Sequence, residues 1–102
     1  MPKFIATYDL EETTPSPHST FLDQAAENGW QPWILGSNDN WYRLPNTTLI
    51  GTFADRKSAV AALKKTKADT QAVLGRTVTM VKWIVSDRGG SSFDSDERQP
   101  KD

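Results

Sequence analysis

The sequence predicts an α+β domain with the ferredoxin-like, split βαβ arrangement. Segments with strand and helix periodicity follow one another in the order β-α-β-β-α-β. Each of the two helical segments carries one apolar stripe, and 102 residues suffice for one small domain. We therefore expect one antiparallel sheet with both helices on a single face, the first and last strands in its middle and the hairpin strands outside.

The first strand and the first helix are predicted near the N-terminus. Residues 3–9 are rich in β-forming side chains. Ser16 is a suitable N-cap and Pro17 a suitable first helical residue, so a helix is expected over 17–28. Gly29 supplies the stop signal at its C-terminal end.

The middle of the chain predicts a hairpin. Residues 30–35 have strand character, although Pro32 has no N–H to donate to a sheet. A turn signal follows at 36–40, and 41–44 are expected to pair as the returning strand. A further strand is expected over 47–53.

A long second helix and a last strand complete the domain. Asp55 is a good N-cap, and the helical pattern runs over 55–74 until Gly75. The β-branched segment 77–85 predicts the last strand. The helix keeps one small or apolar stripe through five turns, formed by Ala59, Ala62, Leu63, Thr66, Thr70 and Val73.

We divide the chain into a ferredoxin-like domain, 1–87, and a polar tail, 88–102, whose composition is typical of disorder. Cysteine is absent, which excludes disulfides, thiol nucleophiles and thiolate zinc sites. No apolar run approaches the ~20 residues that span a bilayer, and no secretory signal is visible. A cytoplasmic location without membrane contact is the expectation.

Apolar residues occur on both faces of the predicted strands, and this pattern favours a homodimer. In the first strand Phe4 and Tyr8 alternate with Ile5, and in the last strand Trp83 alternates with Ile84. A sheet that is apolar on both faces needs a second cover. The sequence offers no further element to provide it, so we expect another copy of the chain to do so.

Carboxylates cluster where the first strand ends, in FIATYDLEE over residues 4–12. Asp9 at a strand end is a candidate metal ligand, because Mg²⁺ needs only one or two protein oxygens beside water and phosphate. The alternative interpretation is that Asp9 solvates the strand end or caps the following turn. No cofactor is expected unless Asp9 binds Mg²⁺.

The Tyr8-Asp9-Leu10 motif, on a chain of this size and element order, resembles the small dimeric ferredoxin-fold nucleases of CRISPR adaptation modules and related toxin–antitoxin endoribonucleases. The resemblance covers the topology of residues 3–85. It implies that Asp9 is the catalytic, metal-binding residue. The family's loop after this aspartate is usually basic, whereas residues 11–17 here are acidic and rich in proline.

Basic side chains are concentrated in the second helix and last strand. Residues 55–88 carry a charge of +5, although the whole chain carries −1. Arg56, Lys64 and Lys67 are the candidate nucleic-acid-binding residues. A solvated helix face is the alternative interpretation.

Other polar and aromatic residues allow two interpretations each. His18, the one histidine, is a candidate general base or a half-buried residue at a helix start. Arg43 is a candidate for holding a phosphate or carboxylate, or a surface arginine. The aromatic residues of 30–42 either stack on a ligand or pack the hairpin or a dimer contact; they are Trp30, Trp33, Trp41 and Tyr42.

Three functions remain from the sequence. The favoured interpretation is a small dimeric regulatory or interaction module without a clear catalytic site. The alternative is a metal-dependent nuclease or nucleic-acid-binding relative that uses Asp9. A small-molecule sensor with a ligand at the dimer interface is the third. One aspartate and one histidine are a thin catalytic inventory, so whether the chain is an enzyme is left open.

Overall fold

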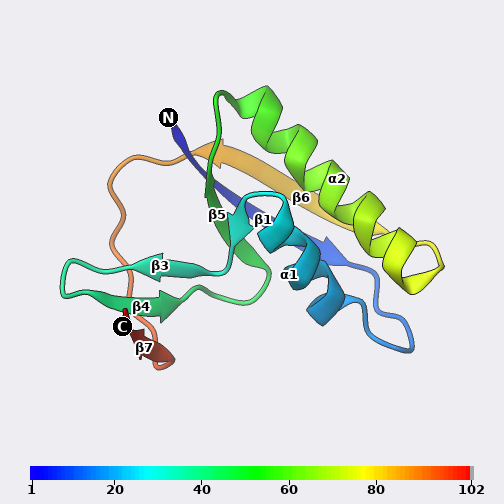
Figure 1. The fold of residues 1–102 in the computed structure, drawn as a ribbon, viewed down its shortest axis with the longest axis horizontal. Helices are drawn as coiled ribbons and strands as arrows, with labels where there is room; N and C mark the ends of the chain where they lie inside the picture. Colours follow the sequence, from blue (N-terminus) through cyan, green and yellow to red (C-terminus); the bar gives the residue numbers. More distant parts are fainter. Residues whose placement is uncertain (102) are drawn as a thin grey trace.

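A computed structural model describes residues 1–101 and shows a mixed α+β architecture with two helices and two antiparallel sheets (Figure 1). The elements, in chain order, are β1 (Lys3–Leu10), α1 (His18–Glu27), β2 (Trp30–Gln31), β3 (Trp33–Leu35), β4 (Asn40–Arg43), β5 (Thr48–Thr52), α2 (Arg56–Leu74), β6 (Met80–Asp87) and β7 (Arg98–Pro100).

The larger sheet has the strand order β2-β5-β1-β6, and every neighbouring pair is antiparallel. The prediction that the last strand lies in the middle was wrong, because β6 forms one edge and β5 lies beside β1. β6 also begins later than predicted, at Met80. Val78, just before it, is buried in the core.

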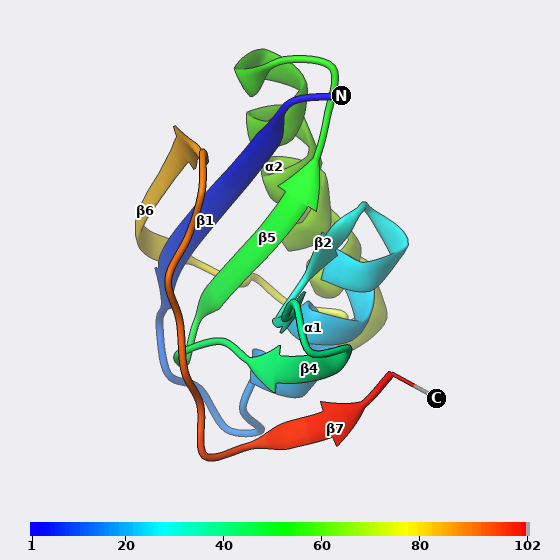
Figure 2. The same cartoon turned by 90° about the vertical axis from the view of Figure 1, so that its left-hand side faces the viewer.

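Both helices cover the same face of this sheet, as predicted (Figures 1 and 2). Alternate residues of β1 point toward the helices and are buried there: Phe4, Ala6, Tyr8 and Leu10. Phe21 from α1 and Leu63 from α2 are fully buried in the same cluster. The apolar stripes therefore meet one side of the sheet and form one core.

The ends of α2 follow from its sequence. The Asp55 carboxylate accepts a hydrogen bond from the Ser58 N–H at 2.7 Å, and this bond holds the pKa of Asp55 below its ordinary value. Gly75 ends the helix in the left-handed conformation with φ of 68°. In α1, by contrast, the first turn has no capping side chain, although the His18 N–H lies 3.4 Å from Ser16 Oγ.

Pro32 divides the predicted 30–35 strand between two sheets. β2 pairs with β5 in the larger sheet, whereas β3 pairs with β4 in a second, three-stranded sheet. Because proline cannot donate a ladder hydrogen bond, the chain leaves the first sheet at this residue. The hairpin therefore projects away from the helices, as Figure 1 shows.

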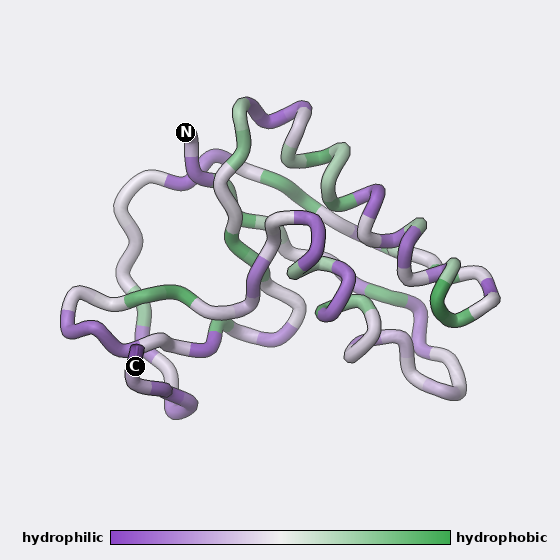
Figure 3. Tube along the Cα trace, viewed as in Figure 1, coloured by the Kyte–Doolittle hydropathy of each residue, from purple (hydrophilic) through white to green (hydrophobic). Residues whose placement is uncertain are grey.

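This hairpin covers part of the second face of the larger sheet. Ile34 and Leu44 form a small core with Ile50 of β5, and Ile5 of β1 packs against it. The argument that only another copy of the chain supplies this cover was therefore wrong. The β6 end of the face stays open, with Ile84 61% exposed. Figure 3 shows apolar residues along part of β6.

The segment predicted as a disordered tail returns to the second sheet in the structure. β7 pairs with β4, and Phe93 packs edge-on against Tyr42 with ring centres 5.4 Å apart. The free edge of β4 offers backbone groups that a passing strand pairs with, whatever its composition. Residue 102 of the predicted 88–102 segment lies outside the described residues.

Leu63→Ala is expected to destabilise the domain by about 2–5 kcal/mol, because it opens a cavity in a fully buried part of the core. Val73→Ala on the same helix is the control, since Val73 is 61% exposed. Urea unfolding of the two variants measures the difference. Equal midpoints would contradict the assignment of Leu63 to the core.

Candidate functional site

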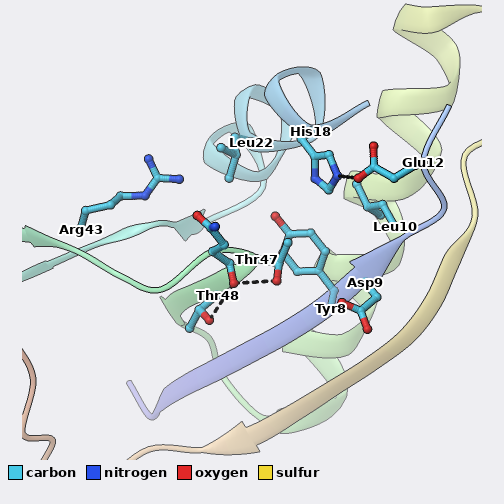
Figure 4. Close-up of a pocket in the computed structure, with 10 residues that line it drawn as sticks. Tyr8, Asp9, Leu10, Glu12, His18, Leu22, Arg43, Thr47 and Thr48 are labelled. Carbon is cyan, nitrogen blue, oxygen red and sulfur yellow. Dashed lines mark hydrogen bonds and ion pairs between the residues drawn. The ribbon is translucent and has the colours of Figure 1, made fainter. Parts of the chain in front are cut away.

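A pocket of about 460 Å³, which we call the Arg43 pocket, opens where β1 ends. Three segments surround it: the end of β1, the start of α1 and the connection from β4 to β5. Its polar lining consists of Tyr8, Glu12, His18, Arg43, Asn46, Thr47 and Thr48, with Leu10 and Leu22 as apolar wall and Asp9 at its border. Figure 4 shows Arg43 at one end, the His18–Glu12 pair at the other and Tyr8 between them.

Tyr8 is a buried residue that contributes its hydroxyl to the pocket. The ring packs against Phe21 with centres 4.6 Å apart, and only 4% of the residue is exposed. Burial raises the pKa of Tyr8 to about 12, and the nearby Arg43 charge lowers it in part. The hydroxyl therefore keeps its proton at neutral pH and is a hydrogen-bond donor.

Arg43 is held in place without an acceptor for its guanidinium. Its Cζ lies 5.9 Å from the ring centre of Trp33, the geometry of a cation–π contact. Its Nε is buried and has no hydrogen-bond partner. Within residues 1–101 no carboxylate lies within ion-pair distance of this side chain.

His18 is committed to a neighbour in the chain. Its Nε2 lies 2.7 Å from Glu12 Oε1, and we assign the donated proton to the imidazole because a carboxylate only accepts. The side chain is 34% exposed, in agreement with the half-buried interpretation. The pair closes one end of the Arg43 pocket.

Asp9, the predicted catalytic and metal-binding residue, lies on the other face of the sheet from the helices. It is exposed and stands opposite Lys82 of β6. Strand alternation separates it from Tyr8, whose side chain points to the helix side. In the described part of the chain, no three His, Asp or Glu side chains form a group that could hold a metal ion.

Two of the three predicted nucleic-acid-binding residues meet in one groove. Lys64 and Lys67 line a hollow of about 320 Å³ between α2 and β6, which we call the α2–β6 groove; its other residues are Ala68, Gln71, Met80 and Trp83. The Lys64 ammonium lies 5.8 Å from the ring centre of Trp83, which is 41% exposed. Arg56 is not in this groove and lies 3.8 Å from Asp87 instead.

Sequence reasoning missed the parts played by Trp83 and Tyr8. Trp83 stands opposite Tyr8 in the β1–β6 ladder, so both side chains point to the helix side. At the sheet edge the second helix leaves Trp83 partly uncovered. The alternation of the last strand indicated that Trp83 and Ile84 lie on opposite faces of the sheet. The strand pairing and the contact with Lys64 show that Trp83 faces α2.

The predicted aromatic cluster does not form one site. Trp30 is fully buried in the main core, with its ring centre 4.8 Å from that of Phe53. Trp33 and Tyr42 belong to the second sheet, where each carries an arginine above its ring. The packing interpretation therefore applies to Trp30, whereas Trp33 positions a residue of the pocket.

Comparisons with protein-family models, curated proteins and solved structures found no match to this chain. Of the helices that the structure describes, none has the length and apolar content to cross a membrane. Function is therefore inferred from the geometry of the Arg43 pocket and the α2–β6 groove.

The free energy of unfolding is expected to fall as the pH rises through 10–12. The unfolded chain ionises Tyr8 near its ordinary pKa of 10.0, whereas the folded chain keeps the proton until about 12. The loss is at most about 3 kcal/mol and is smaller where water reaches the hydroxyl.

Denaturant unfolding of Tyr8→Phe and wild type across this pH range measures the contribution, since the variant keeps the ring against Phe21. Tyr42→Phe, at the other tyrosine, serves as the control. Identical slopes for wild type and Tyr8→Phe would show that Tyr8 ionises equally in both states.

Proposed function

We propose that the chain is a regulatory or interaction module that binds single-stranded nucleic acid in the α2–β6 groove. The observation that carries the proposal is the contact between Lys64 and the exposed Trp83, with Lys67 in the same groove. Such a groove combines a ring on which a base stacks with cations that contact the flanking phosphates. In the free chain Lys64 covers the ring, and a base takes its place on binding.

The charge distribution supports this site. Residues 55–88 carry +5, and they form α2 and β6, the two walls of the groove. Lys65 of the same helix is already paired with Asp69 at 2.8 Å, and Arg56 has Asp87 beside it. Lys64 and Lys67 form no ion pair within residues 1–101, so their charges are available to a polyanion.

We infer that the larger sheet and its helices have the ferredoxin-like, split βαβ arrangement. The strand order β2-β5-β1-β6 and the position of both helices on one face support it. In this interpretation β3 and β4 are an insertion between the two strands of the hairpin, β2 and β5. Pro32 is the residue at which the insertion leaves the sheet.

We propose further that the module is a homodimer joined through β6. This strand is eight residues long, and within the described chain it pairs only with β1. A long free edge with exposed Val81 and Ile84 is a template for strand pairing. A two-fold axis through Ile84 would place the two Ile84 side chains next to each other and continue the sheet across the dimer.

A metal-dependent nuclease that acts through Asp9, with Mg²⁺ as cofactor, is the second candidate. The exposure of Asp9 at the end of a central strand is the observation in its favour. Asp9 and the α2–β6 groove belong to opposite faces of the sheet, however. Nucleic acid held in the groove does not therefore lead directly to this carboxylate.

Fluorescence anisotropy with a labelled oligothymidylate tests the nucleic-acid site. The double variant Lys64→Gln/Lys67→Gln is expected to weaken binding about tenfold or more and to flatten its salt dependence. Trp83→Leu is expected to weaken it by about 5- to 100-fold through lost stacking. Lys65→Gln removes the same charge from another side of α2 and should bind as wild type does.

Unchanged binding by the double variant and by Trp83→Leu would reject the groove as the site. Asp9→Asn separates the two candidate functions in the same assay. Binding that Mg²⁺ strengthens in wild type but not in Asp9→Asn would favour the nuclease, whereas equal behaviour favours the binding module.

The dimer is tested by sedimentation of wild type and Ile84→Lys at micromolar concentration. Wild type is expected to sediment with the mass of two chains, and Ile84→Lys with the mass of one, because two like charges then meet at the axis. Leu35→Lys, at an exposed apolar residue of β3, is the control that leaves the dimer intact. A wild-type chain that stays monomeric would exclude pairing through β6.

A further inference from the structure

The fold holds the Arg43 side chain in place at its pocket, but within residues 1–101 its guanidinium has no hydrogen-bond acceptor. Arg43 lies beside Trp33 and its Nε is buried, so a large part of its conformational freedom is already lost. No hydrogen bond from this guanidinium to any acceptor occurs within residues 1–101. A guanidinium in this state binds a carboxylate or phosphate with little further ordering.

The other charges near the pocket do not satisfy Arg43. Glu12 is bound to His18 at the far end, and Asp9 is exposed on the opposite face of the sheet. Arg43 also borders a second hollow with the acidic segment 94–97. In that segment Asp94 is paired with Arg98 at 2.9 Å, and none of its acids reaches ion-pair distance of Arg43 in the described chain.

The wall between Arg43 and Tyr8 is held in a fixed and strained shape. Thr47 has a φ of 57°, a left-handed conformation that a β-branched residue rarely adopts. The Tyr8 N–H donates to the Thr47 carbonyl at 3.1 Å, which ties this turn to the central strand. Strained residues of this kind persist where the surrounding structure holds them, often beside ligand sites.

We propose that the Arg43 pocket binds a small molecule through an anionic group, a carboxylate or a phosphate, held by the Arg43 guanidinium and the Tyr8 hydroxyl. A volume of about 460 Å³ falls in the range of small-molecule sites. Leu10 and Leu22 provide an apolar wall for the rest of the ligand. The site is independent of the α2–β6 groove and shares no residue with it.

Amide chemical shifts of the full chain test the proposal, with inorganic phosphate and acetate as probes and chloride at equal ionic strength as the reference. Phosphate or acetate is expected to cause saturable shifts at residues 46–48 and at His18, and chloride is not. The probe that binds more tightly identifies the class of anionic group. An absence of saturable shifts with both oxyanions would overturn the proposal.

Arg43→Gln is expected to weaken the tighter-binding probe about tenfold or more, and Tyr8→Phe about fivefold. Arg56→Gln is the charge-matched control, because Arg56 lies beside Asp87 and outside the pocket. It should change affinity by about twofold at most. Spectra of the variants without probe show whether each is folded. Equal affinity of folded Arg43→Gln and wild type would also overturn the proposal.

Discussion

The position of β1 between β5 and β6 is the constraint on which the rest of the structure depends. Both edges of the strand are hydrogen bonded, so its alternation assigns every side chain to one face or the other. Tyr8 and Asp9, adjacent in the sequence, are separated by this rule. Tyr8 joins the helix-side core and the Arg43 pocket, whereas Asp9 faces solvent opposite Lys82. A slip of one residue would exchange them.

The second sheet determines which chemistry surrounds the end of β1. Because the chain leaves the larger sheet at Pro32, it returns through β4 and a turn at 44–47 before β5 begins. That return carries Arg43, already in contact with Trp33, to the mouth of the pocket. A direct hairpin between β2 and β5 would leave Tyr8 and His18 without a cation beside them. The β3–β4 segment thus supplies the cation of the proposed anion site.

Features that depend on neighbouring residues, such as helix ends, could be predicted from the sequence. Features that depend on pairing between distant strands could not. The caps at Asp55 and Gly75 and the apolar stripe of α2 are local, and that helix was predicted within one residue. The edge position of β6 and the pairing of β7 depend on contacts between distant segments, for which composition gives no signal. For the same reason Lys64 and Lys67 were predicted from their charge, whereas their neighbour in the groove, Trp83, was not predicted.

The two proposed anion sites differ in the physics of recognition. Lys64 and Lys67 border an open groove, where screening by salt makes each contact weak and affinity requires several phosphates. Arg43 is half-buried and fixed by Trp33, so one ligand group gains a strong, directional interaction there. Glu12 and Asp9 line the Arg43 pocket away from Arg43, and their charges disfavour an extended polyanion there. A small anion bound at Arg43 stays at the end away from these acids, so the two proposed sites favour different classes of ligand on one small domain.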